Sequence, residues 1–142
     1  MKQEHLVVSS RLDVLNQVQH WFKDVCRSLD TDTTWVSNYV DRLTIALTEG
    51  FTNAVRHAHA DLPPDTTIDI DLSFGCDRIE IRIWDHGQPF DPEALQEPEP
   101  GALLDGGYGW FLLRRLADRV TYKRVKDGRN CLSIVQYGTW FG

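Results

Sequence analysis

Two neighbouring runs in the middle of the chain alternate strictly between apolar and polar residues. Ile68, Ile70 and Leu72 form the apolar half of the first run, and the second run has isoleucine at every other position from 79 to 83. Alternation with a period of two places all the apolar side chains on one face of an extended strand. The residues between the runs, 74–78, include glycine and aspartate, which favour a tight turn. The pattern therefore predicts a β-hairpin with one buried face.

Two segments before this hairpin have helical spacing. Apolar residues recur every three or four positions between Leu12 and Leu29, which predicts a helix that ends near Asp30 and has one apolar stripe. Residues 31–34 carry oxygens that can cap a second helix, expected over 35–59. The complete prediction, in chain order, is a strand at residues 5–9, helices at 12–30 and 35–59, strands at 68–73 and 79–84, a helix at 110–117, and strands at 120–124 and 132–136.

Length and charge narrow the class of protein. A chain of 142 residues is long enough for one domain with a real core, and we expect a single domain over 1–142. The net charge of -6 disfavours binding to the phosphate backbone of nucleic acids. No apolar run is long enough for a signal peptide or a membrane helix, so we expect a cytoplasmic protein.

The cysteines and histidines do not form the pattern of a zinc site. Cys26, Cys76 and Cys131 are odd in number, widely spaced and without a Cys-x-x-Cys pair, so we expect three reduced thiols. His57 and His59 are two residues apart and would not share a helix face. We therefore interpret His59 as a histidine at the end of the helix, where the helix dipole favours a positive charge.

Glu49, Asn53 and His57 follow one another at intervals of four residues in the second predicted helix. On an α-helix such steps are about 40° apart, so the three form a polar row beside the apolar stripe of Leu43 and Leu47. An amide oxygen suits Mg²⁺ and a carboxylate one turn away can deprotonate a hydroxyl, which makes Asn53 the candidate ligand and Glu49 the candidate base. His57 is interpreted as a neighbour of phosphate. Taken alone, the Glu49 and Asn53 pair is also explained by an exposed helix face with a local hydrogen bond.

Asp85 and Gly87 directly follow the isoleucine strand. A carboxylate at the end of a strand can accept a hydrogen bond from the exocyclic amine of adenine, and a glycine two residues later lets the chain approach a flat ring closely. The alternative is an Asx turn between a strand and a loop, which is a frequent structure.

Three glycines, Gly106, Gly107 and Gly109, precede the helix predicted at 110–117. Free backbone N–H groups at a helix start can bind an anion, so Gly107, Tyr108 and Gly109 are candidates for contacts with phosphate. The segment matches neither a Walker loop nor a dinucleotide fingerprint, and a flexible loop remains the alternative. Residues 88–107 contain four prolines and lie between two candidate ligand motifs, so we expect a lid.

The order of these groups resembles the ATPase domain family shared by gyrase, a heat-shock chaperone, histidine kinases and DNA mismatch-repair ATPases. Within it, the chain is most similar to the anti-sigma-factor serine/threonine kinases of bacterial partner-switching systems. Residues 43–59, 85–92 and 106–122 resemble the three motifs of that family, and the likeness covers about residues 6–137. The resemblance implies an α+β fold, a two-layer sandwich with helices on one face of a mixed, mostly antiparallel sheet. It also implies dimers in many relatives.

The resemblance assigns roles to individual residues and implies ATP and Mg²⁺ as cofactors. Asn53 would be the magnesium ligand, and Glu49 would be the base that activates a substrate serine. The remaining positions would contact the nucleotide, Asp85 and Gly87 at adenine and Gly107 and Gly109 at the phosphates.

One position departs from the family pattern. Some family kinases carry an arginine two residues before the first glycine of the Gly-x-Gly, and this chain has Asp105 there. Kinases place a cation near the transferred phosphate, so another side chain has to supply it, and the candidates are Arg56, Arg114 and Arg115. Further carboxylates in the expected lid would make ATP affinity depend strongly on Mg²⁺, and these are Asp91, Glu93, Glu97 and Glu99.

These expectations combine into one functional hypothesis and its rivals. The chain is expected to be a serine/threonine kinase that phosphorylates a small antagonist protein and holds a sigma factor or another regulator when the antagonist is absent, thereby regulating transcription. The alternative is a binding module that keeps nucleotide as a structural ligand and acts by protein capture, which Asp105 favours and Glu49 disfavours. A histidine kinase fragment is less well supported, because residues 12–29 are too short for the helical hairpin that would carry its histidine.

Overall fold

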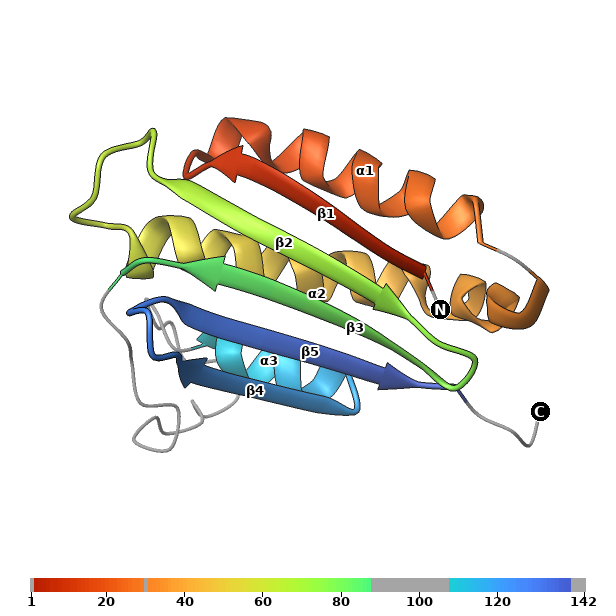
Figure 1. Ribbon diagram of the computed structural model, residues 1–142. Helices are drawn as coiled ribbons and strands as arrows, with labels where there is room; N and C mark the ends of the chain where they lie inside the picture. Colours follow the sequence, from red (N-terminus) through yellow and green to blue (C-terminus); the bar gives the residue numbers. More distant parts are fainter. Residues whose placement is uncertain (1, 30, 88–107, 139–142) are drawn as a thin grey trace.

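A five-stranded sheet and three α-helices make up the described part of the chain in the computed structural model, which comprises residues 2–29, 31–87 and 108–138, without the side chains of 31–34, 108 and 109. The helices all lie on one face of the sheet (Figure 1). The strands are ordered β1-β2-β3-β5-β4. In chain order the elements are β1 Lys2–Ser9, α1 Leu15–Arg27, α2 Val40–Asn53, β2 Thr67–Phe74, β3 Arg78–Asp85, α3 Tyr108–Leu116, β4 Arg119–Arg124 and β5 Asn130–Tyr137.

The alternating runs form the predicted hairpin. β2 and β3 pair antiparallel, with Ile70 opposite Ile83 and Leu72 opposite Ile81. These side chains are almost completely buried under the helices, as the period of two requires. The turn is closed by the Gly75 N–H, which donates to the Arg78 carbonyl oxygen at 2.8 Å.

The α+β sandwich is confirmed, and its sheet is more regular than expected. Each strand pairing in the described residues is antiparallel, where a mixed sheet was anticipated. The connections account for two of these pairings, because β2–β3 and β4–β5 are hairpins and hairpins join antiparallel strands. β5 then lies between β3 and β4, although it is the last of the five strands along the chain.

The second predicted helix is not continuous. A 3-10 segment, Thr31–Asn38, comes first, and α2 begins only after Tyr39, which makes no side-chain cap, so the predicted helix start at residue 35 is wrong. Beyond α2 the chain widens into a π-helical turn, Ala54–Ala58, in which the His59 N–H donates to the Ala54 carbonyl oxygen at 2.8 Å. The first helix also starts late, after a 3-10 turn at Leu12–Val14, and ends at Arg27.

Tertiary packing explains why local helix signals misplaced these boundaries. Val36 in the 3-10 segment is fully buried, and the indole N–H of Trp35 donates to the Cys76 carbonyl oxygen at 3.0 Å. These contacts dock the segment against the β2–β3 turn instead of extending α2.

α2 lies very close to the centre of the sheet. A Cβ atom on Gly50 would be 2.6 Å from Cδ1 of Ile83 and 2.9 Å from Cδ2 of Leu132. Leu43, Leu47 and Phe51 share this face of the helix and are fully buried. None of the described helices combines the length and apolar character needed to cross a membrane.

Candidate functional site

The segments that carry the predicted site residues come together at one end of the sheet (Figure 1). α2 and the π-helical turn end there, β3 ends there at Asp85, and α3 begins there at Tyr108. Gly107 and Asp105 lie outside the described residues, as does the expected lid at 88–107. The fold therefore brings the first two residue groups to the same end of the sheet as the start of α3.

Among the described residues, Asp85 is the most buried carboxylate at this end of the sheet, with 3% of its surface exposed. Its Oδ1 accepts two hydrogen bonds, from the Gly87 N–H at 3.0 Å and from Nδ2 of Asn130 at 2.8 Å. The same Asn130 nitrogen donates to the Gly87 carbonyl oxygen at 2.8 Å. The Asx turn considered from the sequence is therefore present. Both bonds to the carboxylate use Oδ1, so neither involves Oδ2.

Asn130 was not identified from the sequence. It is completely buried at the start of β5 and lies directly opposite Asp85 in the strand register. It shares a strand face with Leu132 and Ile134. A polar residue in line with these apolar residues is the sequence signal that could have marked Asn130 as a site residue. The signal was missed because the predicted strand began at residue 132.

Gly87 packs against the helical layer. A Cβ atom at this position would overlap the carbonyl group of Ala58 and would lie 2.8 Å from its Cα. The close approach predicted for Gly87 is thus observed toward the backbone of the π-helical turn. Its contact with an adenine ring remains a prediction.

His59 differs from the sequence expectation. It follows the π-helical turn, as expected for a helix end, but only 3% of its surface is exposed. Its Nε2 accepts a hydrogen bond from the backbone N–H of His86 at 2.8 Å, and the two imidazole rings stack with centroids 6.1 Å apart. Burial lowers the pKa of His59, Asp85 opposes this shift and His86 adds to it. The residue is therefore a neutral acceptor and not a cation favoured by the helix dipole.

The polar row on α2 is interrupted. Glu49 and Asn53 are half-buried and lie one turn apart in α2, as predicted. His57 lies in the π-helical turn, where each residue advances the chain by a smaller angle than in an α-helix, and its side chain is exposed. His57 therefore departs from the row, and its contact with phosphate remains a prediction. π-helical turns occur frequently at functional sites.

α3 begins two residues before the predicted start. Tyr108 is its first residue, so Gly109 lies inside the first turn instead of preceding the helix. The backbone N–H groups of the first turn have no partner within an α-helix. Tyr108 and Gly109 thus remain candidates for anion contacts.

The structure separates the three arginines considered as phosphate partners. Arg114 and Arg115 lie in the last turn of α3, and the Arg115 carbonyl oxygen accepts a hydrogen bond from Arg42 at 3.3 Å. Arg42 is near the start of α2, about 16 Å along the helix axis from Asn53. Arg56 belongs to the π-helical turn that Gly87 contacts. Of the three, Arg56 is the one at the candidate site.

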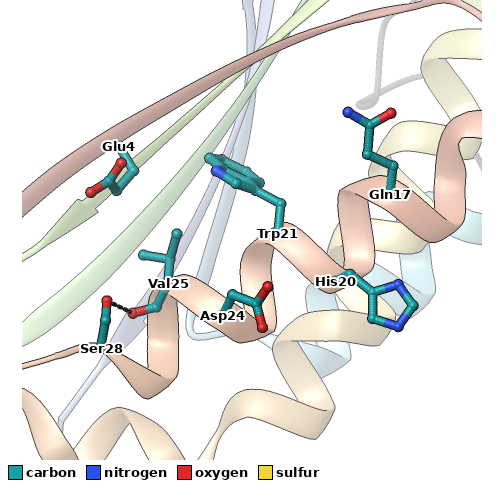
Figure 2. Close-up of a pocket in the computed structure, with 7 residues that line it drawn as sticks. All are labelled: Glu4, Gln17, His20, Trp21, Asp24, Val25 and Ser28. Atoms are coloured by element: carbon teal, nitrogen blue, oxygen red, sulfur yellow. Dashed lines mark hydrogen bonds between the residues drawn. The ribbon is translucent and has the colours of Figure 1, made fainter.

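A separate hollow lies between β1 and α1 (Figure 2). Its two carboxylates are already paired, Glu4 with Lys2 at 4.0 Å and Asp24 with Arg27 at 2.9 Å. It contains none of the predicted site residues. The residues that line it are Glu4, Gln17, His20, Trp21, Asp24, Val25 and Ser28.

Comparison with known proteins identifies the family. A model of the histidine kinase-like ATPase domain matches residues 8–136. The chain belongs to this family. The histidine kinase-like ATPase fold accounts for the helical layer on one face of the sheet, and the resemblance drawn from the sequence is confirmed.

Curated relatives of this ATPase domain include serine-protein kinases named RsbW. The protein from Oceanobacillus iheyensis is 37% identical over 91 residues, covering 57% of this chain and 56% of the relative. The protein from Staphylococcus epidermidis is 34% identical over 101 residues, covering 66% of this chain and 62% of the relative. The aligned part of the chain thus spans less than two thirds of each relative.

A solved structure shares the same ATPase-domain fold. The RsbU and RsbW domains of a Mycobacterium tuberculosis protein match with a TM-score of 0.63 and 13% identity, covering 96% of this chain and 32% of that chain. At this identity the match concerns the fold alone.

Proposed function

We propose that this chain is an ATP- and Mg²⁺-dependent serine/threonine protein kinase that phosphorylates a small antagonist protein. In the absence of that antagonist it captures a sigma factor or another regulator. The observation that carries the proposal is Asp85, a buried carboxylate at the end of β3 in a histidine kinase-like ATPase domain. The RsbW names of the relatives support the kinase assignment.

The polar groups around Asp85 fit an adenine ring. Nδ1 of His59 and Oδ1 of Asn130 are buried and have no hydrogen-bond partner among the described residues. Adenine carries both an amino donor and ring acceptors on its edge, so it can form hydrogen bonds with one unpaired donor and one unpaired acceptor of the protein. Asp85 would bind the exocyclic amine, and Gly107, Tyr108 and Gly109 would contact the phosphates.

Glu49 and Asn53 support phosphoryl transfer. ATP, when bound, supplies the phosphoryl group and Mg²⁺ neutralises part of its charge. Asn53 would hold the metal, Glu49 would accept the proton of the substrate serine, and Arg56 would supply the cation that Asp105 cannot. Their positions at one end of the molecule, on α2 and the π-helical turn, support these roles.

Nucleotide binding is tested by titrating ATP and ADP in the presence of Mg²⁺. Asp85→Asn retains an oxygen that can accept from the Gly87 N–H, but it loses the charge and one acceptor. We expect its affinity to fall roughly tenfold or more, because hydrogen bonds to charged groups are worth about 1.5–3 kcal/mol. Unchanged affinity would remove Asp85 from adenine recognition. Arg27→Ala, on the solvent side of α1, is the matched control and should bind normally.

Phosphoryl transfer is tested with the cognate antagonist domain and labelled ATP. Glu49→Ala and Arg56→Ala should each lower the rate at least about a hundredfold, whereas Arg115→Ala should not. The alternative function is a nucleotide-holding module that acts by capture alone, and Asp105 is the feature that favours it. That alternative predicts tight binding of partner and nucleotide without transfer in the wild-type protein.

A further inference from the structure

We propose that His59 is a positioning residue of the nucleotide site, which holds the Asp85–Gly87 turn in place as a neutral imidazole and releases it when protonated. The inference rests on the proposed nucleotide binding at Asp85. His59 is 3% exposed, and its Nε2 accepts the His86 backbone N–H at 2.8 Å. The imidazole thereby joins the end of the helical layer to the loop that follows β3.

The turn is fixed from two sides. On the helical side, Ala58 leaves no room for a side chain at position 87, and the next residue, His59, binds the His86 N–H. On the sheet side, Asn130 bridges Asp85 and the Gly87 carbonyl oxygen. The direction of the Asp85 carboxylate therefore depends on whether both sets of contacts are intact.

The hydrogen bond from His86 also sets the tautomer of His59. An imidazole nitrogen that accepts a hydrogen bond carries no proton, so the proton of the neutral ring is on Nδ1. Protonation would place a second N–H on Nε2, directly against the backbone N–H of His86. Two donors cannot share a hydrogen bond, so an imidazolium at this position must move or push the turn away.

The charges around His59 define the pH range of this change. Asp85 faces it from β3 and favours the imidazolium, whereas the stacked His86 disfavours it, and burial disfavours it most. The titratable or charged side chains of the preceding π-helical turn are those of Arg56 and His57, and both are exposed. The neutral form therefore persists below the ordinary pKa of histidine, and release is expected only in mild acid.

The experiment measures the dissociation constant of Mg²⁺-ADP from about pH 7.5 down to about pH 4.5, because burial moves the titration of His59 below the ordinary range of histidine. His59→Gln supplies an amide oxygen that can accept the His86 N–H and does not titrate. His59→Leu supplies no acceptor. We expect the glutamine variant to bind like wild type at the upper pH and to lose less affinity in acid. The leucine variant should bind roughly tenfold more weakly throughout, because a buried N–H is left without a partner.

Matched controls separate His59 from other titrating groups. His86→Asn keeps the backbone donor and removes the neighbouring imidazole, and His20→Gln removes an exposed histidine of α1, so both should retain the acid sensitivity. Titration of ADP itself is common to all variants and cancels when they are compared. A long-range proton–nitrogen spectrum should show His59 as the Nδ1–H tautomer at neutral pH.

The inference is overturned if His59→Gln loses affinity in acid as steeply as wild type, or if the spectrum shows the Nε2–H tautomer. These two results do not depend on whether His59→Leu folds. Failure of the wild-type protein to bind ADP at any pH would instead overturn the proposed function.

Discussion

Nδ2 of Asn130 lies 2.8 Å from Oδ1 of Asp85, and both side chains are buried between the ends of β5 and β3. Asn130→Ala removes this donor and leaves the carboxylate and the Gly87 carbonyl oxygen short of one hydrogen bond each. We expect the free energy of unfolding to fall by about 1–3 kcal/mol, measured by urea denaturation. Asn16→Ala, at an exposed position of α1, is the control and should cost less.

Asn130→Asp should give a stability deficit that depends on pH. It places two carboxylates within hydrogen-bond distance, which raises the folded-state pKa of the pair. A carboxyl group whose pKa is raised in the folded state contributes stability below its unfolded-state pKa of about 3.9. This contribution is lost as pH rises through the folded-state pKa. The deficit relative to wild type should therefore be smaller at about pH 5 than at about pH 8. A pH-independent deficit would contradict the observed proximity to Asp85.

Gly87→Ala should disrupt the site by a steric route. The new methyl group would overlap the carbonyl of Ala58, and both partners are backbone, so neither can rotate away. We expect loss of nucleotide affinity together with destabilisation of about 1–3 kcal/mol or more, read by thermal unfolding and ADP titration. Gly75→Ala tests the general cost of replacing a glycine, since a Cβ atom there would be 3.6 Å from Oδ1 of Asp77, which is an ordinary contact distance. Equal behaviour of the two variants would contradict the close contact at Ala58.

Gly50→Ala should act on the core and leave the chemistry of the site groups intact. Its methyl group would meet Ile83 and Leu132 at 2.6 and 2.9 Å, so α2 has to move away from the sheet or these side chains have to repack. Overpacking of this kind costs typically about 1–3 kcal/mol, partly offset by the higher helix propensity of alanine. Pairing it with Ile83→Val and Leu132→Val should recover part of the loss if the clash is the cause.

The three thiols should differ in reactivity. Burial raises the pKa of Cys26 to about 12 and that of Cys131 to about 11, whereas Cys76 is exposed at the β2–β3 turn. The thiolate is the reactive form, so a thiol reagent at about pH 8 should label one site rapidly in the folded protein and all three after unfolding. Cys76→Ser should abolish the rapid phase. A rapid phase that survives this change would show that one of the other thiols is accessible.

The strands were predictable because their signal is local. Alternation of isoleucine and leucine in β2 and β3 defines which face is buried before any partner is known, and the register later pairs Ile70 with Ile83 as required. The helix boundaries were not predictable in the same way. The 3-10 segment and the π-helical turn depend on where Trp35 and Gly87 dock, and these contacts join residues far apart in the chain.

The same distinction applies to the candidate site. Asp85 and Gly87 could be selected because their residue types and spacing are meaningful within one short segment. Asn130 offers only the weak signal of a polar residue in an apolar strand series, and the burial of His59 has no local signal, because the importance of both comes from the neighbours that the fold gives them. A buried histidine that accepts a backbone N–H has no pattern of its own in the sequence. It becomes visible once the end of the helical layer is placed beside the end of β3.

The position of β5 inside the sheet has a consequence for the newly made protein. Asp85 leaves the ribosome 45 residues before Asn130, and β3 acquires its second neighbouring strand only when residues 130–137 have emerged. Until then the edge of β3 has unpaired backbone groups, which is the kind of surface that chaperones shield and that other chains can pair with. The final assembly of the site is therefore tied to the synthesis of the last strand.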